Sequence, residues 1–511
     1  MFEAVVGDFD RTISHAALQA RAAKGASVLN ALGCGEDVPV ALIMRNDLTQ
    51  MEIMRAAAQA GTILVALNWH GAAEEIEAIC ADSGAETVII HRDLIADAAP
   101  ALKGRQVIAV TPEARLRAAY EISDAAAQDG ADYPEWSALV DASEPCEDRA
   151  LMRPLMRYTS GSTGRPKGIR RQATGPRRDF SEALVRIGSE MMQFKPGSRF
   201  FTAAPIYHSA PSTLTSAALV SPGVSTIIAP KFDPHGFLAT IETQQITHIY
   251  LVPTMMSRLL KLPEADRRRH DLSSVEFCIS TGSPWPQDLK QAMIDWWGPV
   301  FWETYGASEI GFMTMASSAD ALERPGTAGR MQMGGTLLIL DADGQELPAG
   351  EVGEIYARMD VFGDFDYSND PAGRKSAEKQ GHISVGDLGW VDEDGYLFIT
   401  DRKKDMIISG GANIFPAEIE AILMRAPFIR DVAVFGAPDP EFGEKIVAAV
   451  EPSQGWNPNA QEVLQFLDGK LARFKHPRVI DFHDALPRED SGKIFKARLR
   501  EPYWRDSGRK V

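Results

Sequence analysis

The chain has 511 residues, of which 45% are hydrophobic and 24% charged; this is the composition of a globular protein, and its length calls for two or more domains. The formal net charge of −17 at pH 7 argues against broad binding to nucleic acids or membrane surfaces, so a bound polyanion needs a local basic pocket. The four cysteines lie far apart without a C-x-x-C pair, which argues against a disulfide framework or a zinc site.

The sequence contains no candidate for a membrane anchor or an export signal. No apolar run approaches the roughly 18 residues that span a bilayer, and the acidic N-terminal segment has no apolar core. We therefore expect a cytoplasmic protein without stable membrane insertion.

The first hundred residues alternate between strand-like and helix-like stretches. Apolar runs such as 38–44 predict buried strands, and the segments 48–61 and 72–84 predict helices that each end at their final glycine. The same alternation returns at 224–262. Helices between short apolar strands indicate βαβ units and a mostly parallel sheet.

The pattern of the sequence changes after Glu351. The segment 389–402 predicts short strands joined by a tight turn, with Asp394-Gly395 as the hairpin signal. A smaller α/β pattern then follows. The predicted domains are 1–401 and 402–511.

The stretch "YTSGSTGRPKGIRR" (158–171) has the composition of an anion-binding loop. Its hydroxyls and backbone amides can wrap a polyphosphate, and the lysine that follows adds charge. It is not a Walker A loop, because Pro166 precedes the lysine and Gly168 follows it. A solvated turn is the alternative interpretation. The candidate phosphate-binding residues are Thr159, Ser160, Gly161, Ser162, Thr163, Gly164 and Lys167.

The first part of this stretch, "YTSGSTGRPKG", resembles the phosphate loop of the adenylate-forming enzymes. This superfamily includes acyl-CoA synthetases, the adenylation domains of peptide synthetases and firefly luciferase. Other family motifs follow in order, so the resemblance covers about 158 to 500. It implies an α/β fold with a large N-terminal AMP-binding domain, built of mostly parallel sheets and a small β-rich subdomain. A small, mobile α/β C-terminal domain would carry the catalytic lysine.

Two motifs imply the adenine site by resemblance. "STGSPWP" (280–286) is similar to the segment that lies against one face of adenine, and "ETYGASE" (303–309) to the segment that closes the other face. The resemblance places Tyr305 on the purine, Gly306 at the acyl pocket and Glu309 on Mg²⁺, although Glu309 alone reads as a surface carboxylate. Ser308 stands where the family usually has threonine and keeps the hydroxyl. The implied adenine-side residues are Gly282, Ser283, Pro284, Thr304, Tyr305 and Gly306.

The segment 385–420 carries the most specific motif of the resemblance. Asp387, with two acceptor oxygens, would hold the ribose hydroxyls, and Arg402 would reach the same ribose. Lys404 falls at the interdomain hinge of the family. The alternative interpretations are that Asp387 and Arg402 form an ordinary surface pair and that the glycines of 409–411 only form a turn. The residues implied at the coenzyme A channel are Ser409, Gly410 and Gly411.

Two more segments imply a catalytic and a pocket residue. "LPREDSGKIFKARLR" (486–500) resembles the last family motif, whose lysine enters the active site on a mobile loop; here this is Lys493. "APIYHSAPS" (204–212) matches the segment with an aromatic residue or histidine at the acyl pocket, here His208. A structural histidine is an equally supported interpretation of His208.

The sequence departs from many relatives directly after the phosphate loop. They read "KGVMLTH", whereas this chain reads "KGIRRQATGPRRDF" (167–180). The arginines of this segment either contact the phosphates of coenzyme A or form a solvated basic loop. They are Arg170, Arg171, Arg177 and Arg178.

The resemblance implies an ATP-dependent acyl-CoA synthetase, an acid–thiol ligase that uses ATP, Mg²⁺ and coenzyme A. It would form acyl-AMP and pyrophosphate, and then transfer the acyl group to coenzyme A. A stand-alone enzyme that loads an acyl carrier protein is the alternative, and a kinase is disfavoured by the missing Walker A loop. The acid stays open among medium- and long-chain fatty, hydroxycinnamic, and steroid or bile acids. Family members are often dimers, so a homodimer stays open.

Overall fold

The structure is a computed structural model that forms two compact units, each of which is described by itself below. The first unit comprises Met1–Pro325, Gly329–Thr336 and Arg358–Glu378, and the second comprises Gly326–Ala328, Leu337–Ala357 and Lys379–Val511. The structure describes residues 5–8, 11–147, 152–159, 167–172, 180–283, 285–488 and 494–505.

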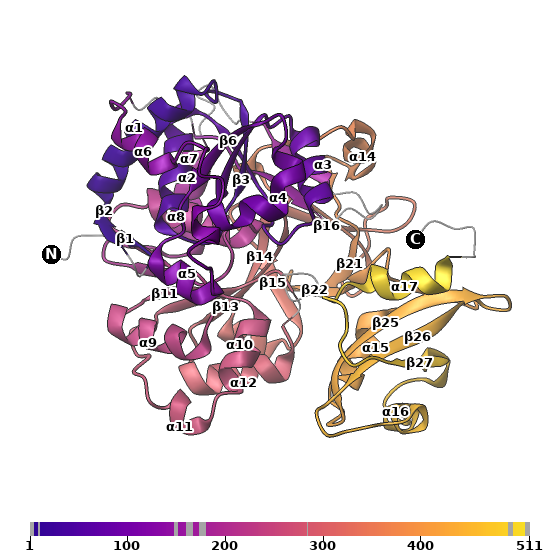
Figure 1. The fold of residues 1–511 in the computed structure, drawn as a ribbon. Helices are drawn as coiled ribbons and strands as arrows, with labels where there is room; N and C mark the ends of the chain where they lie inside the picture. Colours follow the sequence, from indigo (N-terminus) through magenta and orange to yellow (C-terminus); the bar gives the residue numbers. More distant parts are fainter. Residues whose placement is uncertain are drawn as a thin grey trace. The chain divides into compact units, whose positions relative to one another are not determined.

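The first unit contains a seven-stranded sheet with helices around it (Figure 1). Five strands are parallel, and two antiparallel strands, β8 and β18, continue one edge. The helices α2 (Leu48–Ala60) and α3 (Ala73–Ser83) end at glycines with φ of 77° and 73°, which confirms both predicted helix ends. In spatial order the strands are β18 (Phe365–Tyr367), β8 (Lys167–Arg171), β7 (Met156–Thr159), β4 (Ile63–Ala66), β3 (Pro39–Ile43), β5 (Thr87–His91) and β6 (Gln106–Val110).

Strand β3 shows why this sheet is buried on both faces. Val40 and Leu42 pack in one apolar cluster, and Ala41 and Ile43 pack in a second one. Successive side chains of a strand point to opposite faces, so both faces are covered. This is the arrangement expected of a mostly parallel sheet with helices on either side, as the alternating sequence pattern predicts.

A second set of strands in the first unit is also mostly parallel. The strands β1, β10, β9, β11, β12 and β13 run parallel to one another, and β2 and β14 pair antiparallel to β1 and β13. Their bounds are β2 (Thr12–Ser14), β1 (Val5–Gly7), β10 (Ser225–Ile228), β9 (Arg199–Thr202), β11 (His248–Leu251), β12 (Phe277–Ser280), β13 (Phe301–Ala307) and β14 (Gly311–Ser317). The intervening helices include α8 (Ser209–Val220), α9 (Pro234–Gln244), α10 (Pro253–Leu260) and α12 (Gln287–Trp297).

Asn46 joins the two sets of strands. Its side-chain amide donates to the carbonyls of Ala204 (2.9 Å) and Ala229 (3.1 Å), and its oxygen accepts from the backbone N–H of Ile206 (2.9 Å). Asn46 is 4% exposed, so water cannot replace these bonds. The segment that carries His208 is therefore fixed to the loop after β3.

We expect Asn46→Ala to lower the free energy of unfolding by about 3 kcal/mol, because it leaves buried backbone groups without partners. Chemical denaturation measures this change. Asp233→Ala is the control: Asp233 caps the exposed start of α9 by accepting from Gly236 N at 2.6 Å, and its loss costs about 1 kcal/mol. Equal effects of the two substitutions would contradict the structural role of Asn46.

The second unit combines a β-rich part with a smaller α/β part. The β-rich part has β17 (Gly353–Arg358), β21 (Asp387–Val391) and β22 (Leu397–Arg402), and Gly395 has a φ of 78° in the predicted hairpin between the last two. The α/β part has a five-stranded sheet with α15 (Pro416–Leu423), α16 (Ala460–Leu467) and α17 (Lys496–Trp504). Its strands are β24 (Ala412–Ile414), β23 (Ile407–Ser409), β26 (Gly443–Pro452), β25 (Ile429–Asp439) and β27 (Val479–Phe482).

The predicted α/β fold class is confirmed, with a large sheet-containing N-terminal part and a smaller C-terminal part. The predicted domain boundary after Asp401 lies at the end of β22, inside the second unit, and stays a prediction.

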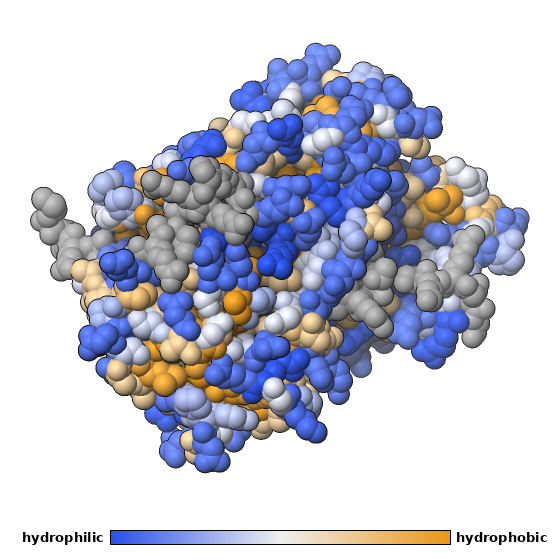
Figure 2. Space-filling model, turned by 90° about the horizontal axis from the view of Figure 1, so that it is seen from above, coloured by the Kyte–Doolittle hydropathy of each residue, from blue (hydrophilic) through white to orange (hydrophobic). Residues whose placement is uncertain are grey.

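The helices in the described part of the chain do not combine the length and apolar character needed to cross a membrane. On the face drawn in Figure 2, hydrophilic residues cover most of the surface, and hydrophobic residues form scattered areas between them.

Candidate active site

The predicted phosphate loop connects two paired strands. The antiparallel strands β7 and β8 set Thr159 opposite Lys167, one at each end of the loop segment. The side chain of Thr159 and the residues Ser160, Gly161, Ser162, Thr163 and Gly164 lie outside the described residues, so their roles stay predictions.

Lys167 forms an ion pair that the sequence analysis missed. Its Nζ lies 2.8 Å from Oδ2 of Asp370 and 5.0 Å from the ring centre of Tyr367. Asp370 is also the N-cap of α14 (Pro371–Ser376) and accepts from Gly373 N at 2.8 Å. The signal in the sequence was the Asp-Pro pair, which is typical of a helix start. Lys167 is thus held beside the loop by a carboxylate distant in sequence.

We expect the stability difference between the wild type and Asp370→Asn to depend on pH. The hydrogen bond from Lys167, followed by that from Gly373, lowers the pKa of Asp370 below its usual 3.8. The stabilisation is therefore present above about pH 4 and is lost as the pH falls through the lowered pKa. Urea unfolding midpoints from pH 7 to pH 3 should converge for the two proteins. A difference that stays constant over this range would contradict the ion pair.

Glu309 is held at the end of the β13–β14 hairpin by two side chains. The hydroxyl of Tyr367 donates to its Oε1 at 3.0 Å. Arg171 donates to the backbone carbonyls of Ser308 (2.8 Å) and Glu309 (2.9 Å). Burial, and then the charge of Glu309, raises the pKa of the Tyr367 hydroxyl, so this hydroxyl stays protonated and remains a donor.

The structure corrects the interpretation that places Arg171 in a solvated loop. Its guanidinium also donates to the carbonyls of Phe362 (3.3 Å) and Gly363 (3.2 Å), so the backbone holds it in place, and a contact with coenzyme A stays an expectation. Burial lowers its pKa to about 10, which leaves it charged at neutral pH. Arg170 is exposed and lies opposite Asp366 of β18. Arg177 and Arg178 lie outside the described residues.

Glu309 suits a magnesium ion that is shared with a nucleotide. The described residues contain no cluster of three or more histidine, cysteine, aspartate or glutamate side chains that could hold a metal. Mg²⁺ is commonly held by one or two carboxylates together with substrate phosphates, which needs no such cluster. Glu309 at the hairpin end is a carboxylate of that kind.

The predicted adenine and acyl segments place two glycines where a side chain would be costly. A Cβ on Gly306 would lie 2.0 Å from the carbonyl oxygen of Gly311, because β13 and β14 have a register shift between Tyr305 and Gly306. Gly282 has a φ of 94°. The backbone geometry at both positions therefore favours glycine, independently of ligand binding.

The other side chains of this predicted group differ in exposure. Thr304 is buried, at 3% exposed, whereas Tyr305 and His208 are half-buried. His208 is the N-cap residue of α8, and its ring lies 4.4 Å from that of Tyr207. Ser283 is exposed to an intermediate degree, and Pro284 lies outside the described residues. The binding roles of all these residues stay predictions.

The second unit brings together the predicted ribose pair. Asp387 and Arg402 are directly opposite on β21 and β22, with 3.5 Å between Arg402 Nε and Asp387 Oδ1. Asp387 is 7% exposed, whereas the side chain of Arg402 is 55% exposed, and the ribose role of the pair stays a prediction. One carboxylate and one guanidinium are thus presented side by side, as binding of a single sugar would need.

The predicted hinge and channel residues also lie in the second unit. The carbonyl of Lys404 accepts from Arg500 of α17 at 3.4 Å, and Arg500 also pairs with Asp405 at 3.3 Å. Ser409 ends β23, and Gly410 and Gly411 form the turn to β24 with φ of 58° and 80°. This turn requires glycine for its geometry alone. Lys493 lies outside the described residues.

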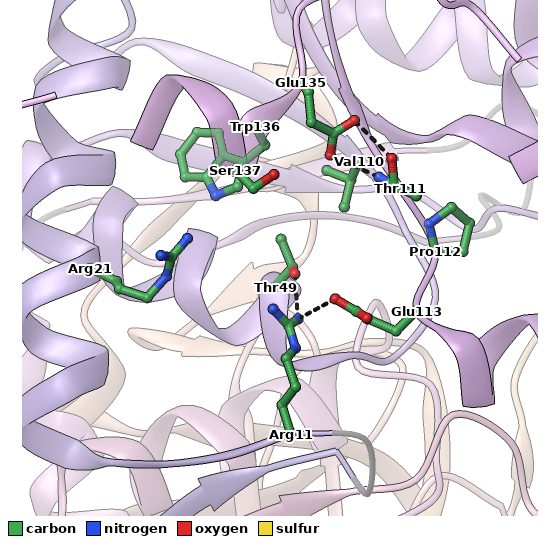
Figure 3. Close-up of a pocket in the computed structure, with 10 residues that line it drawn as sticks. All are labelled: Arg11, Arg21, Thr49, Val110, Thr111, Pro112, Glu113, Glu135, Trp136 and Ser137. Carbon is green, nitrogen blue, oxygen red and sulfur yellow. Dashed lines mark hydrogen bonds and ion pairs between the residues drawn. The ribbon is translucent and has the colours of Figure 1, made fainter. Parts of the chain in front are cut away.

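Figure 3 shows a cavity of about 140 Å³ elsewhere in the first unit. Its charged side chains are compensated by neighbours: Arg11 lies 3.3 Å from Glu113, and Arg21 pairs with Glu52. None of the predicted site residues lines it. The cavity is therefore separate from the candidate active site.

Comparison with known proteins identifies the group to which these features belong. Residues 2–361 match the AMP-binding enzyme family, and residues 418–493 match the AMP-binding enzyme C-terminal domain. The chain belongs to the AMP-binding enzyme family.

The relatives of this AMP-binding enzyme match over almost the whole chain. A feruloyl-CoA synthase of an Amycolatopsis species is 32% identical and covers 96% of this chain and 94% of its own length. The fatty acid–[acyl-carrier-protein] ligase ScoC of Streptomyces coeruleorubidus is 30% identical and covers 98% of this chain and 93% of its own length. MatB from Rhodopseudomonas palustris, known from a crystal structure with bound ATP, is 28% identical. It covers 99% of this chain and 97% of its own, with a TM-score of 0.83.

These matches confirm that the chain is an adenylate-forming enzyme related to the acid–CoA ligases. The family uses ATP and coenzyme A, which supports the corresponding expectation for this AMP-binding enzyme. The sequence analysis missed Asp370, Tyr367 and Asn46, which hold Lys167, Glu309 and the His208 segment.

Proposed function

We propose that this AMP-binding enzyme is an ATP-dependent acyl-CoA synthetase that works in two half-reactions. The observation that carries the proposal is the linked group around Glu309 and Lys167. Tyr367 donates to Glu309, its ring lies under Lys167, and Asp370 pairs with Lys167. A carboxylate suited to Mg²⁺ and a cation are thus linked through Tyr367, and the cation lies at the end of the expected phosphate loop.

In the first half-reaction, the substrate carboxylate attacks the α-phosphorus of ATP and pyrophosphate leaves. Two anions must approach each other, so positive charge must be supplied where negative charge accumulates. Lys167 would exchange Asp370 for the departing pyrophosphate, and Lys493 would meet the carboxylate and the α-phosphate. Glu309 would hold Mg²⁺, which would supply positive charge to the leaving group.

In the second half-reaction, the thiol of coenzyme A attacks the acyl carbon and AMP leaves. Asp387 and Arg402 would keep their hold on the ribose, since both can bond sugar hydroxyls. We propose that Lys404 is the hinge about which Lys493 leaves the site and Ser409–Gly411 approach it. The position of Lys404 two residues after the end of β22 supports this role.

A carrier protein is the second candidate for the acyl acceptor. ScoC, which is 30% identical, is named for transfer to an acyl carrier protein, so the fold serves both acceptors. Feruloyl-CoA synthase at 32% identity favours coenzyme A.

The proposed function is tested by product analysis. The purified enzyme is incubated with ATP, Mg²⁺ and a panel of acids, together with coenzyme A or with a phosphopantetheinylated carrier protein. We expect AMP and acyl-CoA in the first mixture. Acylation of the carrier protein alone would establish the second candidate, and release of ADP would indicate a kinase and contradict both.

A further inference from the structure

Arg157 is an arginine whose charge has no carboxylate partner among the described residues. One terminal nitrogen of its guanidinium donates to two hydroxyls, Oγ of Ser212 and Oγ1 of Thr213, both at 2.8 Å. Its Nε is buried and has no acceptor in the part of the chain that the structure describes. Burial, and then the nearby charge of Arg171, lowers its pKa to about 9, so it remains charged at neutral pH. The Arg157 side chain is half-buried, and hydroxyls alone compensate such a guanidinium poorly.

Other enclosed arginines of the first unit are compensated differently. Arg92 pairs with Glu135, and Arg153 pairs with Glu36 and Asp37. Arg171 satisfies four backbone carbonyls. Within the described ranges Arg157 has neither arrangement, which leaves a half-buried cation with the capacity to bind an anion.

The position of Arg157 points to the acid rather than to a remote site. It lies in β7, two residues before the end of the strand at Thr159, where the phosphate loop begins. Its partners Ser212 and Thr213 belong to the first turns of α8, which starts directly after His208. The guanidinium therefore lies between the start of the phosphate loop and the segment expected at the acyl pocket.

The helix α8 is unusually polar on its buried side. Ser212, Thr213, Thr215 and Ser216 are 0%, 7%, 0% and 3% exposed. Ser212 and Ser216 are one turn apart and therefore share a face. A pocket for an unsubstituted alkyl chain is expected to be lined by apolar side chains. Hydroxyls beside an uncompensated guanidinium instead suit an oxygen-rich anionic group.

We propose that Arg157, Ser212 and Thr213 bind a second carboxylate of the acid, so that the substrate of this enzyme is a dicarboxylic acid. This inference rests on the proposed acyl-CoA synthetase function and deepens it by naming the substrate class. A guanidinium offers two parallel N–H groups to a carboxylate, and the two hydroxyls can turn to donate as well. The first carboxylate of the acid is the one that attacks ATP, and the second stays ionised and unchanged.

The test compares acids that differ only at the far end. Acid-dependent exchange of labelled pyrophosphate into ATP is measured with hexanoate against hexanedioate and with octanoate against octanedioate. We expect the wild type to have the higher kcat/KM for the diacids. Arg157→Met should lower kcat/KM for the diacids about 10- to 100-fold and leave the monoacids unchanged or improved.

Matched variants separate charge recognition from loss of folding. Arg199, on β9, donates to Gln244 at 3.2 Å, and burial also lowers its pKa. Arg199→Met should change both acid classes equally. Arg157→Lys, which keeps the charge, should retain part of the diacid preference. If Arg157→Met does not fold, Ser212→Ala should still reduce kcat/KM for the diacids alone by several-fold.

Four results would overturn the inference. A wild type that prefers monoacids would show that Arg157 does not select the acid. An Arg157→Met variant whose selectivity between diacids and monoacids is unchanged would show the same. An increase of the KM for ATP that is the same with every acid would assign Arg157 to the phosphates. If no acid of either class supports exchange, the proposed function fails as well, which distinguishes that outcome from the other three.

Discussion

Replacing Lys493 by alanine is expected to slow the ATP–pyrophosphate exchange about 10²- to 10³-fold, while transfer from supplied acyl-AMP to coenzyme A changes only a few-fold. The lysine is proposed to contact the carboxylate and the α-phosphate in the first half-reaction only. Both rates are measured on the same preparation, the first by isotope exchange and the second by formation of acyl-CoA.

Arg498→Ala is the control for this prediction. Arg498 is an exposed cation in the same C-terminal segment, on α17, and lies 5.1 Å from the ring centre of Phe495. Its removal should leave both half-reactions near the wild-type rates. Equal losses in both half-reactions for Lys493→Ala would contradict the division of labour between them.

Glu309→Gln is expected to lower the exchange rate by about 10²- to 10³-fold and to weaken the dependence on Mg²⁺. The substitution removes the charge but keeps an oxygen that can accept from Tyr367, so the hairpin should retain its conformation. Titration of the exchange rate with Mg²⁺ measures the effect, and a partial recovery at high Mg²⁺ is expected.

Tyr367→Phe separates orientation of the carboxylate from its charge. It removes the hydroxyl that lies 3.0 Å from Glu309 and leaves the carboxylate charged. Loss of such a supporting contact typically costs about 10-fold or somewhat more in metal affinity or activity. A Glu309→Gln variant with the wild-type rate at limiting Mg²⁺ would exclude Glu309 as the metal ligand.

Local patterns in the sequence predicted most of the individual elements. The strand at 39–43 and the helices that end before Gly61 and Gly84 follow from apolar periodicity and from the left-handed conformation that glycine adopts at a helix end. The hairpin at Asp394-Gly395 follows from the turn geometry that this pair favours. These signals lie within a few residues of the structure that they specify.

The supports of the candidate site could not be predicted in the same way. Lys167 and Asp370 are 203 positions apart, and Arg171 and Ser308 are 137 apart. The first pair arises because β8 lies beside β18 in one sheet, and the second joins β8 to the turn between β13 and β14 of another sheet; a single sequence gives no pairing of distant strands. The motif residues were found by resemblance, whereas no local signal pairs them with the residues that orient them; the Asp-Pro pair at 370–371 indicates a helix start but not the contact with Lys167. The correction for Arg171 has the same cause, since a run of arginines does not reveal which guanidinium is buried.

The central claim is that this chain joins a carboxylic acid to the adenylyl group of ATP. The most direct measurement is the exchange of labelled pyrophosphate into ATP, with Mg²⁺ and a panel of mono- and dicarboxylic acids and with coenzyme A omitted. Our interpretation predicts label in ATP that depends on both the acid and Mg²⁺. Absence of exchange with every acid, in a preparation that binds ATP, would contradict it.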